Sequence, residues 1–315
     1  MSRSPGAAVG GQAVIEGVMM RSPTGWAVAV RRPDGIIEAE GHDLPRLSSR
    51  SRLAKIPFLR GITVLIESLS LGFKALSWSA QKSGEEEEEL KRWQVWVTMI
   101  VGVVFALGLL VVIPVLSANW LKQFFDDSSI AFVIMDGIFR IVVLVGYIAL
   151  IARSDDIQRV FQYHGAEHKT IHAYEAGDRL TIEEIQKFSP RHPRCGTSFL
   201  VIVGLVAFFV FLVLAPLALV WQVVARIVLI PVVAGAAYEL LKAGASSQWL
   251  SWANRPGIWL QKITTKEPSD DMVEVAIASL LTALTEEEAS DLIALGGIPE
   301  DVLNAESTRV EPSNG

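Results

Sequence analysis

Long apolar stretches alternate with charged ones along this chain, and four of the apolar stretches have the length of membrane-spanning helices. They occupy residues 93–121, 128–152, 197–220 and 221–242. The first contains no acidic or basic residue, and about 20 apolar residues are enough for a helix to cross a bilayer. The pattern therefore predicts an α-helical integral membrane protein with four transmembrane helices.

Lysine and arginine indicate how these helices would lie, because short loops rich in basic residues stay in the cytoplasm. Lys91 and Arg92 precede the first apolar stretch, whereas the loop after it, from Trp120 to Ser128, offers only Lys122. Seven basic residues lie between the second and third stretches: Arg153, Arg159, Lys169, Arg179, Lys187, Arg191 and Arg194. We expect a multi-pass protein of the cell membrane with both termini in the cytoplasm.

Two charges interrupt the second apolar stretch. Asp136 and Arg140 are one helical turn apart, so they can pair and reduce the cost of placing two charges in lipid. We predict that they form an intramembrane ion pair that holds neighbouring helices together.

The first 50 residues follow a different pattern, in which apolar and β-branched residues are interrupted by glycines and short turn sequences. Residues 10–21 and 26–32 have the composition of strands, and Pro33-Asp34-Gly35 supplies the Asp-Gly signal of a β-hairpin. Residues 1–50 are therefore predicted to form a small β unit.

Residues 51–92 combine a helical segment with an acidic linker. Arg60, Glu67 and Lys74 are seven positions apart and share one face of the helix. This pattern favours an amphipathic helix that lies on a membrane surface or packs on a helical bundle. The run of charge from Glu85 to Glu89 suits a solvated linker.

The segments beyond the second and fourth apolar stretches are polar. Residues 153–196 are predicted to form a cytoplasmic, helical segment rich in histidine, between transmembrane pairs at 93–152 and 197–243. Residues 244–284 are predicted to form a cytoplasmic loop and an amphipathic helix from Asp270 to Leu284. Residues 285–315 are acidic, and we expect them to be disordered.

Composition supports a membrane protein and excludes some other classes. Hydrophobic residues make up 51% of the 315 positions and the mean hydropathy is +0.39, which is too apolar for an ordinary soluble enzyme. A net charge of −6 argues against a nucleic-acid partner. Cys195 is the single cysteine, so an intramolecular disulfide is excluded and its thiol is available as a ligand.

The stretch from Tyr163 to Glu175, Y-H-G-A-E-H-K-T-I-H-A-Y-E, holds three of the five histidines. His164, Glu167 and His168 fit the pattern H-x-x-E-H, in which two imidazoles one helical turn apart share a metal and the carboxylate activates a bound water. We predict that His164 and His168 bind a divalent transition metal and that Glu167 is the catalytic base. Zinc is the ion we expect, with iron, manganese and nickel left open.

Helix geometry leaves the remaining ligands open. His164 and His172 lie about 12 Å apart along a helix, too far to bind one ion, so the pairs are His164 with His168 or His168 with His172. Four residues could complete the site: His172, Glu175, His192 and Cys195. Glu16 and Arg21 of the β unit could support it. The alternative is a polar histidine face that only packs on a neighbour.

Three blocks of this sequence resemble the YqhQ-like bacterial membrane proteins. They are G-G-Q-A-V-I-E-G-V-M-M-R from Gly10, F-Q-Y-H-G-A-E-H-K-T-I-H from Phe161 and H-P-R-C-G-T-S-F from His192, within a resemblance that covers about residues 10–280. The family is a domain of unknown function described as a predicted metal-dependent enzyme. The resemblance therefore implies a metal-dependent enzyme of the bacterial inner membrane, and it supplies no substrate.

Residues and resemblance together predict a membrane-embedded, metal-dependent enzyme, hydrolytic, with a site that faces the cytoplasm. The expected partners are the lipid bilayer and an unidentified substrate, and association into a homo-oligomer is left open. The competing hypothesis is a non-enzymatic membrane carrier or assembly factor with a structural histidine cluster. A carrier needs polar residues along several spans, whereas Asp136, Arg140 and Arg226 are the ones that stand out.

Overall fold

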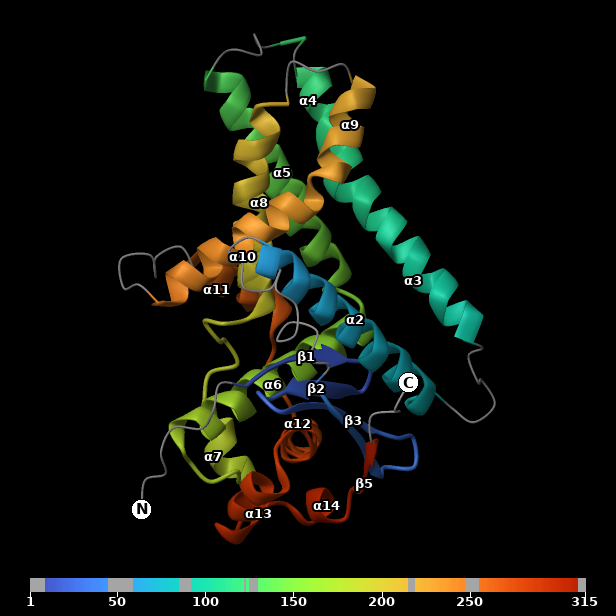
Figure 1. Cartoon of the computed structure of the whole chain (residues 1–315), viewed down its shortest axis with the longest axis vertical. Helices are drawn as coiled ribbons and strands as arrows, with labels where there is room; N and C mark the ends of the chain where they lie inside the picture. The colour runs from blue at the N-terminus through green and yellow to red at the C-terminus, as the bar shows by residue number, and fades with distance from the viewer. Residues whose placement is uncertain are drawn as a thin grey trace.

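The computed structural model describes residues 9–44, 59–84, 92–121, 123–124, 130–214, 219–246 and 255–310. A β-sheet covered by helices forms one end of the molecule, and apolar helices extend away from it toward the other end (Figure 1). The predicted acidic linker from Glu85 to Glu89 lies outside the described residues.

The sheet has five strands in the order β1 to β5. They are β1 Gly10–Val14, β2 Gly17–Arg21, β3 Gly25–Arg31, β4 Ile37–Asp43 and β5 Glu306–Val310. The first four pair antiparallel, and the predicted turn joins β3 to β4 with Gly35 at a φ of 88°. That backbone conformation favours glycine. β5 pairs with β4 in parallel, although the two strands lie near opposite ends of the sequence.

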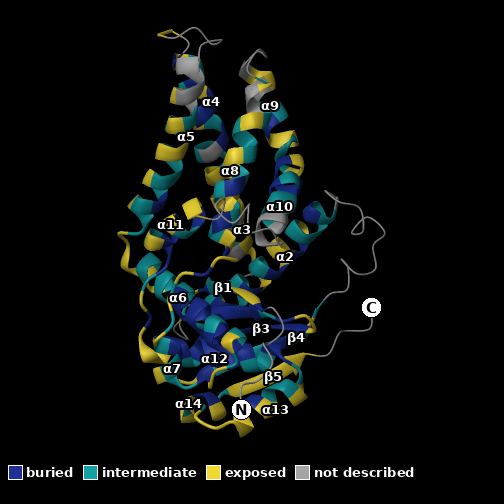
Figure 2. Cartoon of the chain, turned by 90° about the vertical axis from the view of Figure 1, so that its left-hand side faces the viewer, coloured by how far each residue is buried: buried dark blue, intermediate teal, exposed yellow. Residues whose placement is uncertain are grey.

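Both faces of the sheet are covered. One face, with Val18, Met20, Ala27 and Ala29, packs on α6 (Asp155–Ala176) and α12 (Asp270–Ala283). The other, with Val14, Met19, Val28 and Val30, packs on α2 (Leu59–Lys82). Successive strand residues point to opposite faces, which explains why these two sets alternate along β2 and β3. Strands β2 and β3 are accordingly among the most buried parts of the molecule (Figure 2).

Helix α12 is buried on almost every side. It begins after Ser269 with Asp270 and Asp271 in its first turn, where acidic side chains favour the positive end of the helix dipole. Met272, Val273 and Ile277 are among the residues that it buries against β2, β3, β4 and α6. The sequence predicted an amphipathic helix here, and the structure makes it the central helix of the core.

The acidic C-terminal segment is ordered as far as Val310, which contradicts the predicted disorder. Thr285 and Glu288 form a capping box at the start of α13 (Glu286–Ala294), and α14 (Glu300–Leu303) and β5 follow. Leu292 and Val302 are buried in the same core as α12. Residues 311–315 lie outside the described residues.

Two of the three charged side chains on one face of α2 form ion pairs with other elements, whereas Lys74 is exposed. Arg60 pairs with Glu239 of α10 (Ile230–Ser246), and Glu67 pairs with Arg21 at the end of β2. Gly61 lies so close to Gly235 that a β-carbon there would be 2.9 Å from the Gly235 Cα. The helix therefore packs between the sheet and the apolar helices. Of the two alternatives that its sequence pattern left open, this is packing on a helical bundle.

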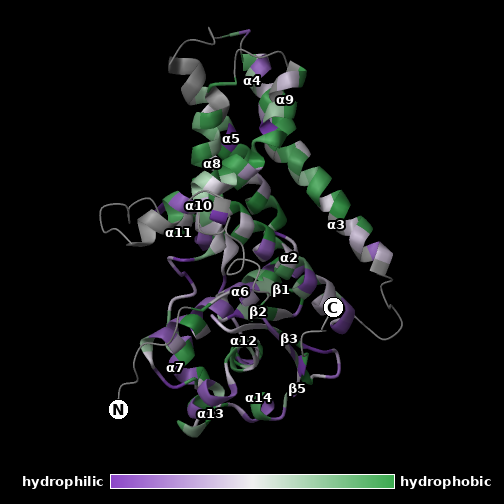
Figure 3. Ribbon diagram, viewed as in Figure 1, coloured by the Kyte–Doolittle hydropathy of each residue, from purple (hydrophilic) through white to green (hydrophobic). Residues whose placement is uncertain are grey.

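The prediction of four transmembrane helices is wrong. Among the described residues, no single helix is both long enough and apolar enough to cross a membrane. The segments Gly137–Ile151 and Asp155–Ala176 meet the criterion only as a pair, and they bend by 101°. Apolar residues are nevertheless concentrated on the helices that extend from the sheet (Figure 3).

Breaks in the helices explain this result. The apolar stretch at 93–121 divides into α3 (Arg92–Leu107), a π-helical segment (Gly108–Val112) and α4 (Ile113–Leu121). The later stretch divides into α9 (Leu219–Val228) and α10, and α8 (Gly196–Leu212) has only 17 residues. α5 (Ile130–Ile151) turns sharply into α6. A hydropathy average over a window does not register such breaks.

The predicted ion pair on α5 stays a prediction. The side chain of Asp136, which would pair with Arg140, lies outside the described residues.

Candidate metal centre

The histidine motif lies in the middle of α6, which the sequence delimits at both ends. Asp155 and Asp156 occupy its first turn, and Gly177 ends it in the left-handed conformation with a φ of 75°. Between these ends, α6 packs on β1 and α12 and buries the residues from Tyr163 to Ile171 except His164, which is half-buried. The motif is therefore held on a rigid element next to the sheet.

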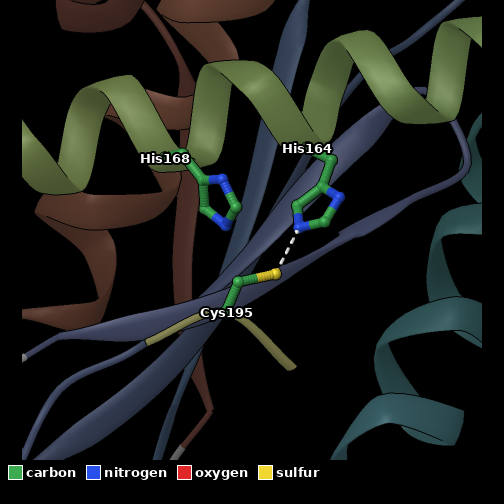
Figure 4. A group of neighbouring side chains, drawn as sticks. All are labelled: His164, His168 and Cys195. Atoms are coloured by element: carbon green, nitrogen blue, oxygen red, sulfur yellow. Dashed lines mark hydrogen bonds between the residues drawn. The ribbon is translucent and has the colours of Figure 1, made fainter. Parts of the chain in front are cut away.

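Three residues converge on one point beside α6: His164, His168 and Cys195. One potential ligand atom from each lies within 4.8 Å of those of the other two. Figure 4 shows the two imidazoles and the thiol facing one another, with 3.2 Å between Nε2 of His164 and Sγ of Cys195. Cys195 immediately precedes α8, so the group connects α6 to the start of that helix.

Backbone carbonyls fix the tautomer of both histidines. Nδ1 of His164 lies 2.8 Å from the carbonyl oxygen of Thr264, and Nδ1 of His168 lies 2.7 Å from that of Pro190. A carbonyl oxygen only accepts, so each Nδ1 carries the proton and donates it. The lone pair of each ring is therefore on Nε2, the arrangement that a metal-binding histidine needs. Burial lowers the pKa of His168 to about 2, which keeps its ring neutral.

A buried glutamine holds the loop that supplies two of these contacts. Gln261 of α11 (Arg255–Thr264) accepts a hydrogen bond from the main-chain N–H of His192 at 2.8 Å and donates one to its carbonyl oxygen at 2.9 Å. Its side chain is fully buried. The loop thus fixed carries Pro190 and Cys195, and α11 itself supplies the carbonyl of Thr264, so α11 positions all three members of the group.

The thiol of Cys195 is buried and hydrogen-bonded at the start of α8. Its sulfur lies 3.4 Å from the main-chain nitrogen of Thr197, which donates to it, and 3.2 Å from the Thr197 hydroxyl oxygen. Burial raises the pKa of the thiol, while both Thr197 contacts lower it. A cation in contact with the sulfur would favour the thiolate further.

Glu167 lies beside the group with a carboxyl that has lost its hydration. Only 3% of the residue is exposed, and Oε2 has no hydrogen-bond partner. Burial raises the pKa of Glu167 to about 8, and the nearby His164 acts in the opposite direction. Gly11 of β1 makes room for this carboxyl, since a β-carbon at Gly11 would lie 3.1 Å from Oε1.

The other predicted ligands form a neighbouring polar cluster. Nε2 of His172 donates to the carbonyl of Arg191 at 3.1 Å, and Nδ1 of His192 accepts from the N–H of Arg194 at 3.2 Å. Glu175 forms an ion pair with Arg194 and lies 3.7 Å from Nε2 of His192. Burial lowers the pKa of His192 to about 3. Of the two histidine pairs that the spacing left open, the structure brings together His164 and His168.

The two residues expected to support the site from the β unit have other partners. Glu16, at a φ of 51° in the turn between β1 and β2, pairs with Arg159 and lies 3.4 Å from the hydroxyl of Tyr163. Arg21 pairs with Glu67 of α2. The residues that do support the histidines, Thr264 and Pro190, act through backbone carbonyls, which leave no signal in side-chain identity.

The donor set fits a divalent transition metal. Two neutral imidazole nitrogens and one sulfur are ligands that zinc takes in proteins, and three protein ligands leave a fourth position open. The Nδ1–H groups already bond to carbonyls, as metal-bound histidines almost always do. The group His164, His168 and Cys195 could therefore hold a metal ion, and its role as a ligand set stays a prediction.

Comparisons with known proteins agree with the resemblance in the sequence. A family model described as a protein of unknown function, DUF1385, matches residues 56–286. The uncharacterized protein YqhQ of Bacillus subtilis (strain 168) is 37% identical over 304 residues, which cover 90% of this chain and 94% of that protein. No solved structure matches the chain. The similarity to a YqhQ-like family is confirmed, and it assigns no activity.

Proposed function

Since this chain belongs to the DUF1385 family of proteins of unknown function, we propose a function from its own residues. The chain is a metal-dependent hydrolase in which His164, His168 and Cys195 hold a divalent transition metal, zinc by preference, and Glu167 transfers the proton. The observation that carries this proposal is the convergence of three donor atoms within 4.8 Å beside a buried, unpartnered carboxylate oxygen.

The chemistry divides between the ion and the chain. A bound zinc ion would lower the pKa of a coordinated water toward about 7 and polarise a substrate oxygen. Glu167 suits the transfer of a proton because a general base works best with a pKa near the working pH, and its pKa is raised to about 8. Thr264 and Pro190 keep the imidazoles in the required orientation.

A second candidate function uses the same atoms without a metal. Sγ of Cys195 lies 3.2 Å from Nε2 of His164, whose Nδ1–H is oriented by the carbonyl of Thr264. A nucleophile, a base and a group that orients the base are the parts of thiol-dependent acyl transfer. The two Thr197 contacts at the start of α8 favour the thiolate of Cys195, and they oppose the burial that raises the pKa of this thiol.

The metal content of purified protein tests the first function. We expect the chain to retain zinc after purification and His168→Ala to lose it. His172→Ala is a matched control, because this imidazole lies one turn further along α6 and outside the group. Equal zinc content in the wild type and a folded His164→Ala/His168→Ala variant would show that the histidine cluster is structural.

Glu167→Gln separates metal binding from catalysis. The amide keeps the shape of the side chain and cannot act as a base, so the variant should retain metal and fail to replace the native gene in a host that lacks it. Full complementation would exclude general-base chemistry and favour an assembly factor or carrier. Activity that survives complete chelation of metal and disappears in Cys195→Ser would establish the thiol mechanism instead.

The location at the cell membrane, with the site on the cytoplasmic side, is part of the same proposal. It is supported by large apolar side chains that α3 and α5 expose, such as Val101, Val104, Ile141 and Leu150. These side chains suit contact with lipid. We expect the chain to sediment with membranes; complete recovery in the soluble fraction would contradict this location.

A further inference from the structure

A second candidate site lies in the C-terminal part of the chain. Helices α12, α13 and α14 and strand β5 enclose an open pocket of about 370 Å³, which shares no lining residue with the metal centre. Its lining is mainly apolar and includes Ala278, Leu281, Ala289, Ile293, Val302 and Leu303. Ile293 is 42% exposed and Leu303 is 54% exposed, so this apolar surface is open to solvent.

One wall of this pocket is the edge of the sheet. β5 is the last strand in the sheet order, and no other described strand pairs with its outer side. All five of its residues are exposed (Figure 2), and Ser307, Thr308 and Arg309 line the pocket. An edge strand presents unpaired N–H and C=O groups, which are the groups that a further strand would bind.

The elements around the pocket carry an excess of negative charge, whereas the pocket lining itself contains one acidic residue, Glu286, and one basic residue, Arg309. Residues 285–310, which form α13, α14 and β5, contain seven acidic residues and one basic residue, Arg309. Six of the acidic residues are exposed: Glu286, Glu287, Asp291, Glu300, Asp301 and Glu306. Such a surface repels nucleic acid and acidic peptides and attracts basic ones.

We propose that this groove binds an extended, basic segment of a partner protein, which adds a strand to β5 and places apolar side chains in the pocket. Main-chain hydrogen bonds to the edge strand supply affinity, and the pocket selects the side chains on one face. Successive side chains of a strand point to opposite faces, so every second residue of the segment is apolar. Lysine or arginine between them contacts the exposed acidic residues of α13 and α14 around the pocket.

The experiment is the selection of peptides from a phage-displayed random dodecapeptide library with the full-length chain as bait. We expect enriched peptides with basic residues and apolar residues at every second position. A synthetic peptide of the enriched sequence should bind Leu303→Asp and Ile293→Asp at least tenfold more weakly than the wild type. An added acidic residue would strengthen a purely electrostatic attraction, so this loss isolates the apolar contact.

Leu295→Asp is the matched control, because Leu295 is 43% exposed at the end of the same helix as Ile293 and does not line the pocket. It should bind as the wild type does, and so should protein stripped of metal. The proposal fails if no sequence is enriched, if the enriched peptides are acidic or follow a helical spacing of apolar residues, or if Leu303→Asp and Leu295→Asp weaken binding equally.

Discussion

Nε2 of His164 and Sγ of Cys195 lie 3.2 Å apart, although 31 positions separate the two residues in the sequence. The contact joins α6, which packs on the sheet, to the start of α8, which belongs to the apolar helices. The candidate centre therefore lies at the junction between the sheet with its covering helices and the apolar helices. Because the thiol and the histidines belong to different elements, the role of the thiol can be tested separately.

Cys195→Ser should weaken metal binding while the fold persists. Serine keeps the size of the side chain and removes the soft sulfur ligand, so we expect affinity to fall by about tenfold or more. With cobalt as the probe, the thiolate-to-metal charge-transfer absorption band of the wild type should be absent in Cys195→Ser. His172→Ala should leave both quantities unchanged; a cobalt spectrum identical in Cys195→Ser and the wild type would exclude the sulfur as a ligand.

Gln261→Leu should affect both stability and the metal centre. It leaves the buried main-chain N–H of His192 without its partner, at a cost of about 1–3 kcal/mol, and it leaves the carbonyl oxygen of His192 with only the 3.3 Å hydrogen bond from the N–H of Cys195. Because the loop also positions Pro190 and Cys195, metal affinity should fall by about 10- to 100-fold. Urea unfolding of metal-free protein and calorimetric titration with zinc measure the two effects.

A loss of stability in Gln261→Leu with unchanged affinity and an unchanged cobalt spectrum would show that Gln261 is purely structural. Gln261→Glu helps to separate the roles. Its carboxylate can still accept from the N–H of His192, whereas the donor to the carbonyl oxygen is lost. We expect an intermediate effect on affinity.

Gly11→Ala should destabilise the protein by about 1–3 kcal/mol because the strand has no space for a methyl group. A β-carbon at Gly11 would lie 2.4 Å from the carbonyl oxygen of Met19 and 3.1 Å from Oε1 of Glu167. Gly10→Ala is the control, since nothing lies within 4 Å of its β-carbon. Equal denaturation midpoints for the two variants would contradict the close approach of Glu167 to β1.

The stability of metal-free protein should depend on pH through Glu167. Burial raises its pKa from 4.5 to about 8, so between these values the folded state holds a proton that the unfolded chain has released. The contribution of Glu167 is complete below pH 4.5 and is lost as pH rises to about 8, at up to about 1.4 kcal/mol per pH unit.

Comparison with Glu167→Gln isolates this effect, because the other titrating groups are common to both proteins. Unfolding free energies measured in the presence of a chelator should fall more steeply with pH in the wild type. Parallel curves for the two proteins between pH 4.5 and 8 would show that Glu167 titrates normally.

Leu292→Ala should cost about 2–5 kcal/mol, although it lies in the segment whose composition indicates disorder. Leu292 is 3% exposed and packs in the core with α12. Leu295→Ala, at an exposed position three residues later, should change stability by less than about 0.5 kcal/mol. Equal effects in thermal unfolding would mean that α13 does not pack on the core.

Local signals in the sequence were sufficient for part of this fold and part of the site. The turn at Gly35 follows from an Asp-Gly pair, and the shared face of His164 and His168 follows from their spacing of four on a helix. Cys195 is a candidate donor by residue type alone.

The remaining features depend on contacts between distant residues. The acidic composition of the C-terminal segment predicts disorder. It gives no information on the parallel pairing of β5 with β4, in which Glu306 lies opposite Glu38. The supporting carbonyls of Pro190 and Thr264 belong to no particular residue type. The apolar stretches predict transmembrane helices because their hydropathy is high, and hydropathy gives no information on where the structure divides them into shorter helices.

The parallel pairing of β4 with β5 and the cover that α12 gives to the sheet have a consequence for synthesis on the ribosome. Strands β1 to β4 leave the ribosome before α12, which begins at Asp270. Until α12 has been synthesised, the apolar face of these strands has no helix to cover it. At about 5–20 residues per second, the delay is on the order of 10–50 s. Contacts of such high sequence separation form slowly. The nascent chain therefore exposes an unpaired strand edge and an apolar surface, which is the kind of intermediate that chaperones bind.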